Sequence, residues 1–433
     1  AGGSANGNGA PAGDGDGDEH QRFAYNQWKK HAPLLYDLLY NHNLTHPSPC
    51  VRWGHVISED STTTTQRIYY SERGASPNTI VVANVKINKI GMSDPLKMDK
   101  YDENNSCPSI TEPLRIETPD RTEVNKIYTF QQNKNLIVAK SDLSQLHIFD
   151  VTQGSSRPAA MTLSGHSPDS CESNFALDTS SGSTRPRVVS GDKDGVILVW
   201  DISAELRGSS KDIAPTTRFE GHSATVEDVC FKPGSHTEVC SVGDDRRLLF
   251  WDERSGTNPV LEAPKWSSVD LHCVDWNPSD VNLLVTGTAD GATFVFDHRK
   301  VSAPLHRLKQ HDEAVFRVGW LPQSTSHFAS GGDDGFLYLW DLSRVGMHQD
   351  ADAAGNGPPE IIMKHAGHRG SVQDFQWNSH NPWVMASVSE DAMWASQGGT
   401  MQIWRPLDFV SRDPNDCLAQ IDKLQSDIRG AIE

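Results

Sequence analysis

A repeated pattern of three short apolar runs constrains the fold more than any other feature of this chain. In its clearest copy, residues 221–252, the sequence reads GHSATVEDVCFKPGSHTEVCSVGDDRRLLFWD. The three runs are separated by a Pro-Gly turn and an Asp-Asp turn, which is typical of an antiparallel three-stranded meander. Related copies cover residues 123–150, 165–201, 270–297, 311–341 and 367–404.

The spacing of these copies predicts a ring of blades. Closing aspartates fall at Asp150, Asp201, Asp252, Asp297 and Asp341. Their steps of about 44 to 51 residues match the period of a WD40 propeller blade. A single meander cannot cover both of its faces and needs neighbours of its own kind. With an N-terminal blade expected from strands over residues 50–90, we predict an all-β, seven-bladed WD40 propeller over residues 50–410. Strands from the two ends of the chain should close it in one sheet.

Segments outside the repeats are expected to flank this ring. Residues 1–20 consist mainly of Gly, Ala, Asn and Asp and predict a disordered acidic tail. Residues 21–46 place apolar side chains at three- and four-residue spacing and predict an N-terminal helix, which Pro33 kinks or restarts. Residues 414–431 predict a short amphipathic C-terminal helix, and residues 342–366 an acidic Pro-Pro insertion loop.

Composition narrows the class of partner. A formal net charge of −18 argues against wholesale or sequence-specific DNA binding and favours basic partners, of which histones are the obvious class. The seven cysteines form no C-x-x-C motif, which indicates a reducing intracellular compartment. No apolar stretch approaches the ~18 residues of a membrane span, and no signal-peptide pattern opens the chain, so no membrane association is expected.

Several specific stretches carry a family resemblance over nearly the whole chain, from about Tyr25 to about Gln425. They read QWKKHAPLLYDLL, TEVNKI, GNGPPEII, HAGHRGSVQDFQWN and NPWVMASVSED. The sequence resembles the histone-binding WD40 family of the retinoblastoma-binding proteins and the plant MSI proteins, and most of all the plant FVE branch. The resemblance implies a non-enzymatic nuclear scaffold without a cofactor. It would bring histone deacetylase, Polycomb-type or nucleosome-assembly machinery to histones H3 and H4.

The resemblance also implies a groove between the N-terminal helix and the Pro-Pro loop that takes the first helix of histone H4. Carried onto this chain, its apolar floor consists of Leu34, Leu35, Leu38, Ile361 and Ile362. Its acidic rim consists of Asp350, Asp352 and Glu360. An amphipathic basic helix laid in such a groove is a recurring mode of recognition.

A second implied surface is the top face of the ring, for the tail of histone H3 or similar Arg/Lys-rich peptides. The matching positions are Glu123, Asn125, Glu227, Asp270, Phe316 and Glu390. Each lies beside the start of a blade's first expected strand or in a turn, and a circle of carboxylates suits an Arg or Lys side chain. The chain departs from the family at Asn174 and Ala314, where relatives carry Glu, and at Lys126, where they carry Arg.

An alternative function is that of a substrate receptor of a cullin-type ubiquitin ligase. Trp251, Asp252, Glu253 and Arg254 form a Trp-Asp-x-Arg ending that resembles the docking box for the ligase's propeller adaptor. Arg254 would then insert into the adaptor. A degenerate second copy, FDHR, occupies residues 296–299.

Enzymatic and metal-binding interpretations are disfavoured. His222, Ser241 and Asp245 include the residue types of a nucleophilic triad. However, the same set recurs in the copies that end at Asp201 and Asp341, and a repeated polar set indicates a structural hydrogen-bond network rather than a single catalytic site. The pair His365 and His368 lacks a third ligand nearby, so no metal is expected.

Overall fold

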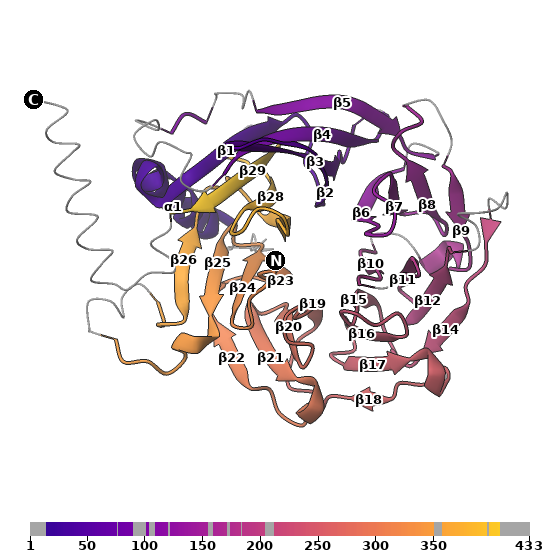
Figure 1. Ribbon diagram of the computed structural model, residues 1–433. Coiled ribbons are helices and arrows are strands. Elements are labelled where there is room, and N and C mark those ends of the chain that lie inside the picture. The colour runs from indigo at the N-terminus through magenta and orange to yellow at the C-terminus, as the bar shows by residue number, and fades with distance from the viewer. Residues whose placement is uncertain are drawn as a thin grey trace, which may run out of the picture.

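Seven antiparallel sheets are arranged around a central channel (Figure 1). The computed structural model describes residues 14–75, 77–89, 101–103, 109–119, 122–154, 159–170, 174–182, 184–203, 212–349, 357–395 and 398–407. The predicted seven-bladed propeller is confirmed, including the N-terminal blade added to the six sequence copies. No helix in the described part of the chain is long and apolar enough to cross a membrane.

Each blade is a short meander that begins at the channel. Blade 1 holds β2 (Val51–Glu59), β3 (Thr63–Ser71), β4 (Thr79–Asn88) and β5 (Ile110–Glu117). Blade 2 holds β6 (Val124–Thr129), β7 (Leu136–Ser141), β8 (Leu146–Asp150) and β9 (Met161–Leu163), with β13 (Asp212–Ile213) added in parallel at its edge. Blade 3 holds β10 (Leu177–Thr179), β11 (Arg187–Gly191), β12 (Val196–Asp201) and β14 (Thr217–Glu220). Blade 4 holds β15 (Val226–Phe231), β16 (Glu238–Gly243), β17 (Leu248–Asp252) and β18 (Leu261–Glu262).

The remaining three blades continue the ring. Blade 5 holds β19 (Leu271–Trp276), β20 (Leu283–Thr288), β21 (Ala292–Asp297) and β22 (His306–Lys309). Blade 6 holds β23 (Val315–Trp320), β24 (His327–Gly332), β25 (Leu337–Asp341) and β26 (Ile361–His365). Blade 7 holds β27 (Val372–Trp377), β28 (Met385–Glu390), β29 (Gly399–Pro406) and β1 (Tyr36–Leu44). The first strands of neighbouring blades contact one another, and we call these seven strands the inner strands.

The core lies between and within the blades. The third strands of four blades carry tryptophans that are at most 1% exposed, namely Trp200, Trp251, Trp340 and Trp404. The inner strands are also pinned to one another by side chains. In four places a carboxylate accepts a backbone N–H from the next blade: Asp178 from Phe231, Asp228 from Val274, Asp275 from Trp320 and Asp374 from Val51. A buried polar group that gains a partner in this way also fixes the spacing of two blades.

Ring closure is confirmed, but the predicted N-terminal helix over residues 21–46 is wrong in its second half. Residues 36–44 form β1, which pairs antiparallel with β29 from Tyr36 opposite Pro406 to Leu44 opposite Gly399. Arg405 and Asp37 add an ion pair at 2.7 Å across this seam. The segment YDLLYNHNL satisfies a helical and an alternating pattern at once, and the free edge of β29 decides in favour of the strand.

The N-terminal helix α1 spans Asp14–Leu35 and starts earlier than predicted. The expectation of a disordered tail over residues 1–20 is therefore wrong for residues 14–20, and residues 1–13 lie outside the described part. Gln21, Tyr25, Trp28 and Ala32 follow helical spacing and are buried, so α1 is held by the face that packs on the ring. Pro33 lies in the last turn, and the helix ends two residues later.

Two other predicted segments differ from the structure or lie outside its described part. Residues 342–366 are not one loop, because they contain the 3₁₀ turn Leu342–Arg344 and the strand β26. The predicted insertion ends in a strand because the third strand of blade 6 offers it an unpaired edge. The predicted C-terminal helix over residues 414–431 lies outside the described residues, as does the end of the predicted propeller range beyond residue 407.

Candidate functional site

Helix α1 is joined to both ends of the ring by a buried polar chain. Trp28 Nε1 donates to the Tyr36 hydroxyl at 2.8 Å, and that hydroxyl contacts His365 Nδ1 at 2.6 Å. His365 Nε2 contacts Gln402 Oε1 at 2.9 Å, and an amide oxygen can only accept, so Nε2 carries the proton. Burial lowers the pKa of His365 to about 3, which keeps the ring neutral. The chain of contacts fixes α1 against β1, β26 and β29.

Apolar side chains of α1 and β26 lie over the same hydrophobic cluster. Ala24 and Leu35 from α1 and Ile361, Ile362 and Met363 from β26 are all partly buried against it. The register of β26 explains why adjacent isoleucines both do so. Leu339 pairs with Met363 and Trp340 with Ile361, so Ile362 is the extra residue of a β-bulge. We call these five residues the helix–strand strip.

The structure brings together some of the residues predicted for the histone H4 groove. Leu35, Ile361 and Ile362 belong to the helix–strand strip, and Leu34 is 50% exposed at the end of α1. Leu38 does not belong there, because it lies on β1 and is buried in a separate cluster with Val51 and Trp53. This residue was misplaced because it was assigned to the helix. The sequence analysis also missed Ala24 and Met363, although the two-residue spacing of Ile361 and Met363 was a usable signal.

The predicted acidic rim is described only at one position. Glu360 is half-buried, and its backbone carbonyl accepts the Asp341 N–H at 2.8 Å, which fixes the turn that follows Pro358. Asp350 and Asp352 lie outside the described residues.

The predicted top face is built from β-bulges that recur from blade to blade. In five blades the inner strand carries a β-bulge at its second residue, where pairing with the next strand shifts. The bulged residues are Asn125, Glu227, His272, Phe316 and Gln373. A bulge re-aims one side chain and increases the local twist. Three of these five were predicted for the top face, while His272 and Gln373 were missed because a bulge leaves no mark in the sequence pattern.

One arc of the top face, at this mouth of the channel, is strongly acidic. Burial raises the pKa of Glu227 to about 7, with a further contribution from the neighbouring charges of Asp244, Asp228 and Asp270. Phe316 stacks on His272 with ring centroids 6.1 Å apart, and His272 follows Asp270 by two residues in the chain. Blades 4, 5 and 6 therefore place carboxyl groups and an aromatic face at the start of their inner strands. Asp244, in the turn after β16, was missed by the sequence analysis.

The other predicted top-face residues are engaged differently. Glu123 forms an ion pair with Arg73 at 3.2 Å, and Asn125 is 1% exposed and donates to Asp142 at 2.8 Å. Glu390 is exposed at the end of β28. Asn174, one of the expected departures from the family pattern, is buried.

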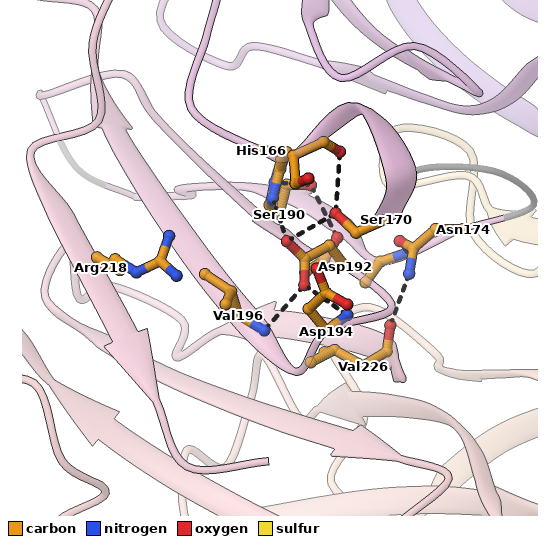
Figure 2. A network of polar contacts seen from close by, with 12 residues as sticks. His166, Ser170, Asn174, Ser190, Asp192, Asp194, Val196, Arg218 and Val226 are labelled. Atoms are coloured by element: carbon orange, nitrogen blue, oxygen red, sulfur yellow. Dashed lines mark hydrogen bonds and ion pairs between the residues drawn. The ribbon is translucent and has the colours of Figure 1, made fainter. Parts of the chain in front are cut away.

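Figure 2 shows how Asn174 is engaged. Its side-chain amide donates to the Val226 carbonyl at 3.2 Å. Its side-chain oxygen accepts from the buried Lys140 ammonium. Lys140 also donates to Ser190 Oγ at 2.8 Å. The asparagine thus joins blade 3 to blade 4 and accepts a hydrogen bond from a buried cation.

The recurring His-Ser-Asp sets are hydrogen-bond networks inside the blades. His166 contacts Asp192 at 2.9 Å and Ser190 at 3.1 Å, as Figure 2 shows. Blade 4 repeats this with His222, Asp245 and Ser241, and blade 6 with His311, Asp334 and Ser330. In blades 4 and 6 the serine oxygen also accepts the indole N–H of Trp251 or Trp340 at 2.8 Å. A serine held in this way between an imidazole and an indole is buried in the blade and joins two strands.

Replacing Ser241 by alanine should therefore cost stability. The change leaves the buried Trp251 Nε1 and His222 Nε2 without their shared partner. We expect the free energy of unfolding to fall by about 1–3 kcal/mol, the usual cost of stranded buried polar groups. Urea denaturation followed by tryptophan fluorescence measures this. Ser223→Ala, at an exposed position whose backbone N–H rather than hydroxyl is used, is the control. Equal stability of the two variants would contradict the network's structural role.

The predicted adaptor-docking ending forms a compact turn on the surface. Asp252 caps the 3₁₀ turn Glu253–Ser255, and the Arg254 guanidinium folds back onto it at 2.6 Å. Asp297 and Arg299 repeat this geometry after β21, again at 2.6 Å. Both arginine side chains are more than two-thirds exposed. Trp251, by contrast, is buried within blade 4 and does not belong to this surface.

Within the described ranges, no three His, Cys, Asp or Glu side chains are arranged to hold a metal ion. His365 is committed to Tyr36 and Gln402, and His368 contacts Thr400 and Ser387 at 3.0 and 2.8 Å. The four cysteines that the structure describes, Cys50, Cys230, Cys240 and Cys273, are free thiols.

Comparison with known proteins gives consistent results. Residues 24–89 match the family model of the histone-binding protein RBBP4, which also describes a component of the CAF1 complex, and residues 213–252 and 302–341 match the WD40 repeat model. The chain is 36% identical to the WD-40 repeat-containing protein MSI4 of Arabidopsis thaliana, over 93% of this chain and 85% of that protein. It is 30% identical to the WD-40 repeat-containing protein MSI3 of the same plant, over 90% of each chain.

Proposed function

Because the chain belongs to the histone-binding WD40 family of the RBBP4 and MSI type, we propose that it is a non-enzymatic histone-binding scaffold whose helix–strand strip takes the first helix of histone H4. One observation carries the assignment to this place. Residues from opposite ends of the chain, Leu35 and Ile361, pack partly exposed on one hydrophobic cluster. An amphipathic helix laid across them would cover both at once.

Apolar contacts and charge would contribute differently to the formation of such a complex. Each aliphatic anchor that becomes fully covered contributes about 1.5–3 kcal/mol. Leu34 and Phe23, which are 50% and 63% exposed on α1, extend the apolar surface along the helix. Glu360 and the net charge of −18 favour a basic partner and increase its association rate more than its affinity.

We propose that the top face receives a basic peptide such as the tail of histone H3, at the acidic arc around Glu227 and Asp270. A cationic side chain there would favour the ionised form of Glu227. Since the pKa of free Glu227 is about 7, affinity should fall as the pH is lowered through 7, because the carboxyl must then lose a proton to bind. Phe316 adds an aromatic face for the peptide's apolar stem.

The proposed role is nuclear and structural. The scaffold would present histones to histone deacetylase, Polycomb-type or chromatin-assembly machinery, in transcriptional repression among other processes, and the enzymatic step would belong to those partners. The hydrogen-bond networks in blades 3, 4 and 6 support a non-catalytic role, since these His-Ser-Asp sets repeat as structural contacts within the blades.

Calorimetric titration of the purified protein with two synthetic peptides tests this proposal. One peptide is the first helix of histone H4 and the other is the H3 tail. We expect the H4 helix to bind with negative heat-capacity change, because apolar surface is buried. A peptide of the same composition in scrambled order is the control. Equal binding of the native and scrambled H4 sequences would remove the helix-in-groove proposal.

A second candidate function is docking to the propeller adaptor of a cullin-type ubiquitin ligase. The exposed Asp-x-Arg turn at Asp252 and Arg254, repeated at Asp297 and Arg299, supports it. Arg254→Glu should reduce recovery of the adaptor in a pull-down at least tenfold, since it places a like charge beside Asp252. Arg218→Glu, another exposed arginine on a blade edge, serves as the control. Unchanged recovery with Arg254→Glu would eliminate this candidate.

A further inference from the structure

A cavity of about 410 Å³ lies in the channel at the mouth opposite the top face. It is walled by the ends of the inner strands, whereas Glu227 and Asp270 lie at their beginnings. Its charged lining residues are Asp178, Asp275, Arg317 and the solvent-exposed Lys134, and its uncharged polar lining includes Tyr128, Cys230 and Gln376. Indole and phenyl groups, including those of Trp276 and Trp320, complete the wall. This volume is within the range of small-ligand sites, about 300–1,000 Å³.

Charges on the inner strands below the top mouth do not balance. The carboxylates are Asp178, Asp228, Asp275 and Asp374, and the cations are Arg52, Lys126 and Arg317. All three cations are directed to the same two carboxylates. Asp374 lies against Arg52, at 3.7 Å from Lys126 and at 3.6 Å from Arg317, and Asp228 lies at 3.5 Å from Arg317.

Asp178 and Asp275 have no ion pair with any residue that the structure describes. Asp178 accepts the backbone N–H of Phe231 at 2.8 Å, and Asp275 accepts that of Trp320 at 2.7 Å. Both line the cavity and keep part of their surface exposed within it, on either side of Cys230 from the blade between them. Burial raises the pKa of Asp178 to about 7 and that of Asp275 to about 6, although Arg317 lowers the pKa of Asp275 in part.

We propose that this cavity binds an organic cation, a guanidinium or primary ammonium group on a short apolar stem, with Asp178 and Asp275 as its counter-charges. The cation restores the missing positive charge, and the stem lies against the aromatic wall. Arg317 supplies only part of that charge, because it lowers the pKa of Asp275 but lies within 4 Å of Asp374 and Asp228 instead. A bare metal ion fits less well, since the described residues offer no third ligand with the two carboxylates.

The same chemistry could come from a free small molecule or from a lysine or arginine side chain of a protein, and the test separates the two. One arm uses n-butylguanidinium chloride. The other uses an Ala-Arg-Ala tripeptide blocked at both ends. Each is titrated into the full chain at pH 8 and followed by calorimetry. If the natural ligand is a protein side chain, we expect the tripeptide to bind at least tenfold more tightly than n-butylguanidinium. If the natural ligand is a free small molecule, we expect n-butylguanidinium to bind at least as tightly as the tripeptide.

The double variant Asp178→Asn/Asp275→Asn should weaken binding of both probes at least tenfold. Its amide oxygens still accept the Phe231 and Trp320 N–H groups, so the blades remain joined. Glu220→Gln, at an exposed carboxylate on the outer strand β14, is the matched control and should leave binding unchanged. The proposal is overturned if neither probe binds the wild-type protein, or if the double variant binds as well as the control.

Proton release gives a readout that needs no variant. At pH 6.5 both carboxyls are partly protonated, and a bound cation would lower each pKa, so binding must release protons. Calorimetric titrations in two buffers of different ionisation enthalpy measure the number of protons released on binding. Zero released protons would refute the assigned counter-charges. Binding of the histone H4 helix is a separate measurement at a distant surface, and its outcome does not depend on this one.

Discussion

Replacing Asp374 by alanine is expected to lower the free energy of unfolding by about 3–5 kcal/mol, the range seen when one partner of a buried ion pair is removed. The carboxylate is fully buried, contacts Arg52 and lies within 4 Å of Lys126 and Arg317. It also accepts the Val51 N–H at 3.1 Å and so joins blade 7 to blade 1. Alanine would leave three buried cations without their common counter-charge at the point where the ring closes.

Urea denaturation at pH 7 measures this loss, with two controls. Asp374→Asn keeps an acceptor for Val51 and should lose less. Asp178→Asn removes a buried carboxylate that has no ion pair with any described residue and should leave stability at pH 8 unchanged or raised. A loss of less than about 1 kcal/mol for Asp374→Ala would contradict the assigned role of the carboxylate.

The contributions of Asp374 and Asp178 to stability should change with pH in opposite directions. The pKa of Asp374 is held below its ordinary value by the surrounding cations, despite burial. Its stabilising contribution is therefore present at neutral pH and is lost as the pH falls through that low pKa. Asp178 has a raised pKa of about 7, so its folded form binds more protons than its unfolded form between pH 4 and 7. Its contribution to stability falls as the pH rises through this window.

The second large effect concerns histone binding. The combined change Leu35→Asp and Ile361→Asp should weaken binding of the H4 first-helix peptide at least 100-fold. Each substitution removes a central apolar anchor, for which losses of about 2 kcal/mol or more are typical, and places a carboxylate in an apolar contact. Calorimetry with the peptide used above measures the change.

Both sites are partly exposed, so the introduced carboxylates can reach water and the ring should remain folded. Circular dichroism and the unfolding midpoint verify this before titration. Val260→Asp, a change at a residue 50% exposed in the turn between β17 and β18, is the matched control and should bind as the wild type does. Unaltered affinity in a folded double variant would refute the location of the site.

Much of the ring could be predicted from the sequence, because six of the seven blades repeat the same pattern of three strands and turns. Residues 36–44 could not be assigned correctly. Leu38 and Leu39 satisfy a helical and a strand pattern equally well, and only the edge of β29, which lies more than 350 residues away in the chain, decides between them. Leu38 was placed in the histone groove for the same reason.

Local geometry escaped prediction for a different reason. The bulges that re-aim His272 and Gln373 depend on pairing with the second strand of each blade and leave no compositional mark. The exposure of both Ile361 and Ile362 on one cluster likewise depends on a bulge. The inner-strand aspartates were visible in the sequence, but their partners are backbone N–H groups of the next blade, which no local pattern reveals.

Hydrogen exchange of the protein with and without the H4 first-helix peptide tests the central claim most directly. We expect new amide protection in two segments together, residues 24–35 of α1 and residues 361–365 of β26, with no change at the inner strand over residues 226–231. Protection confined to one of the two segments, or located elsewhere on the ring, would contradict the claim that both ends of the chain build a single binding surface.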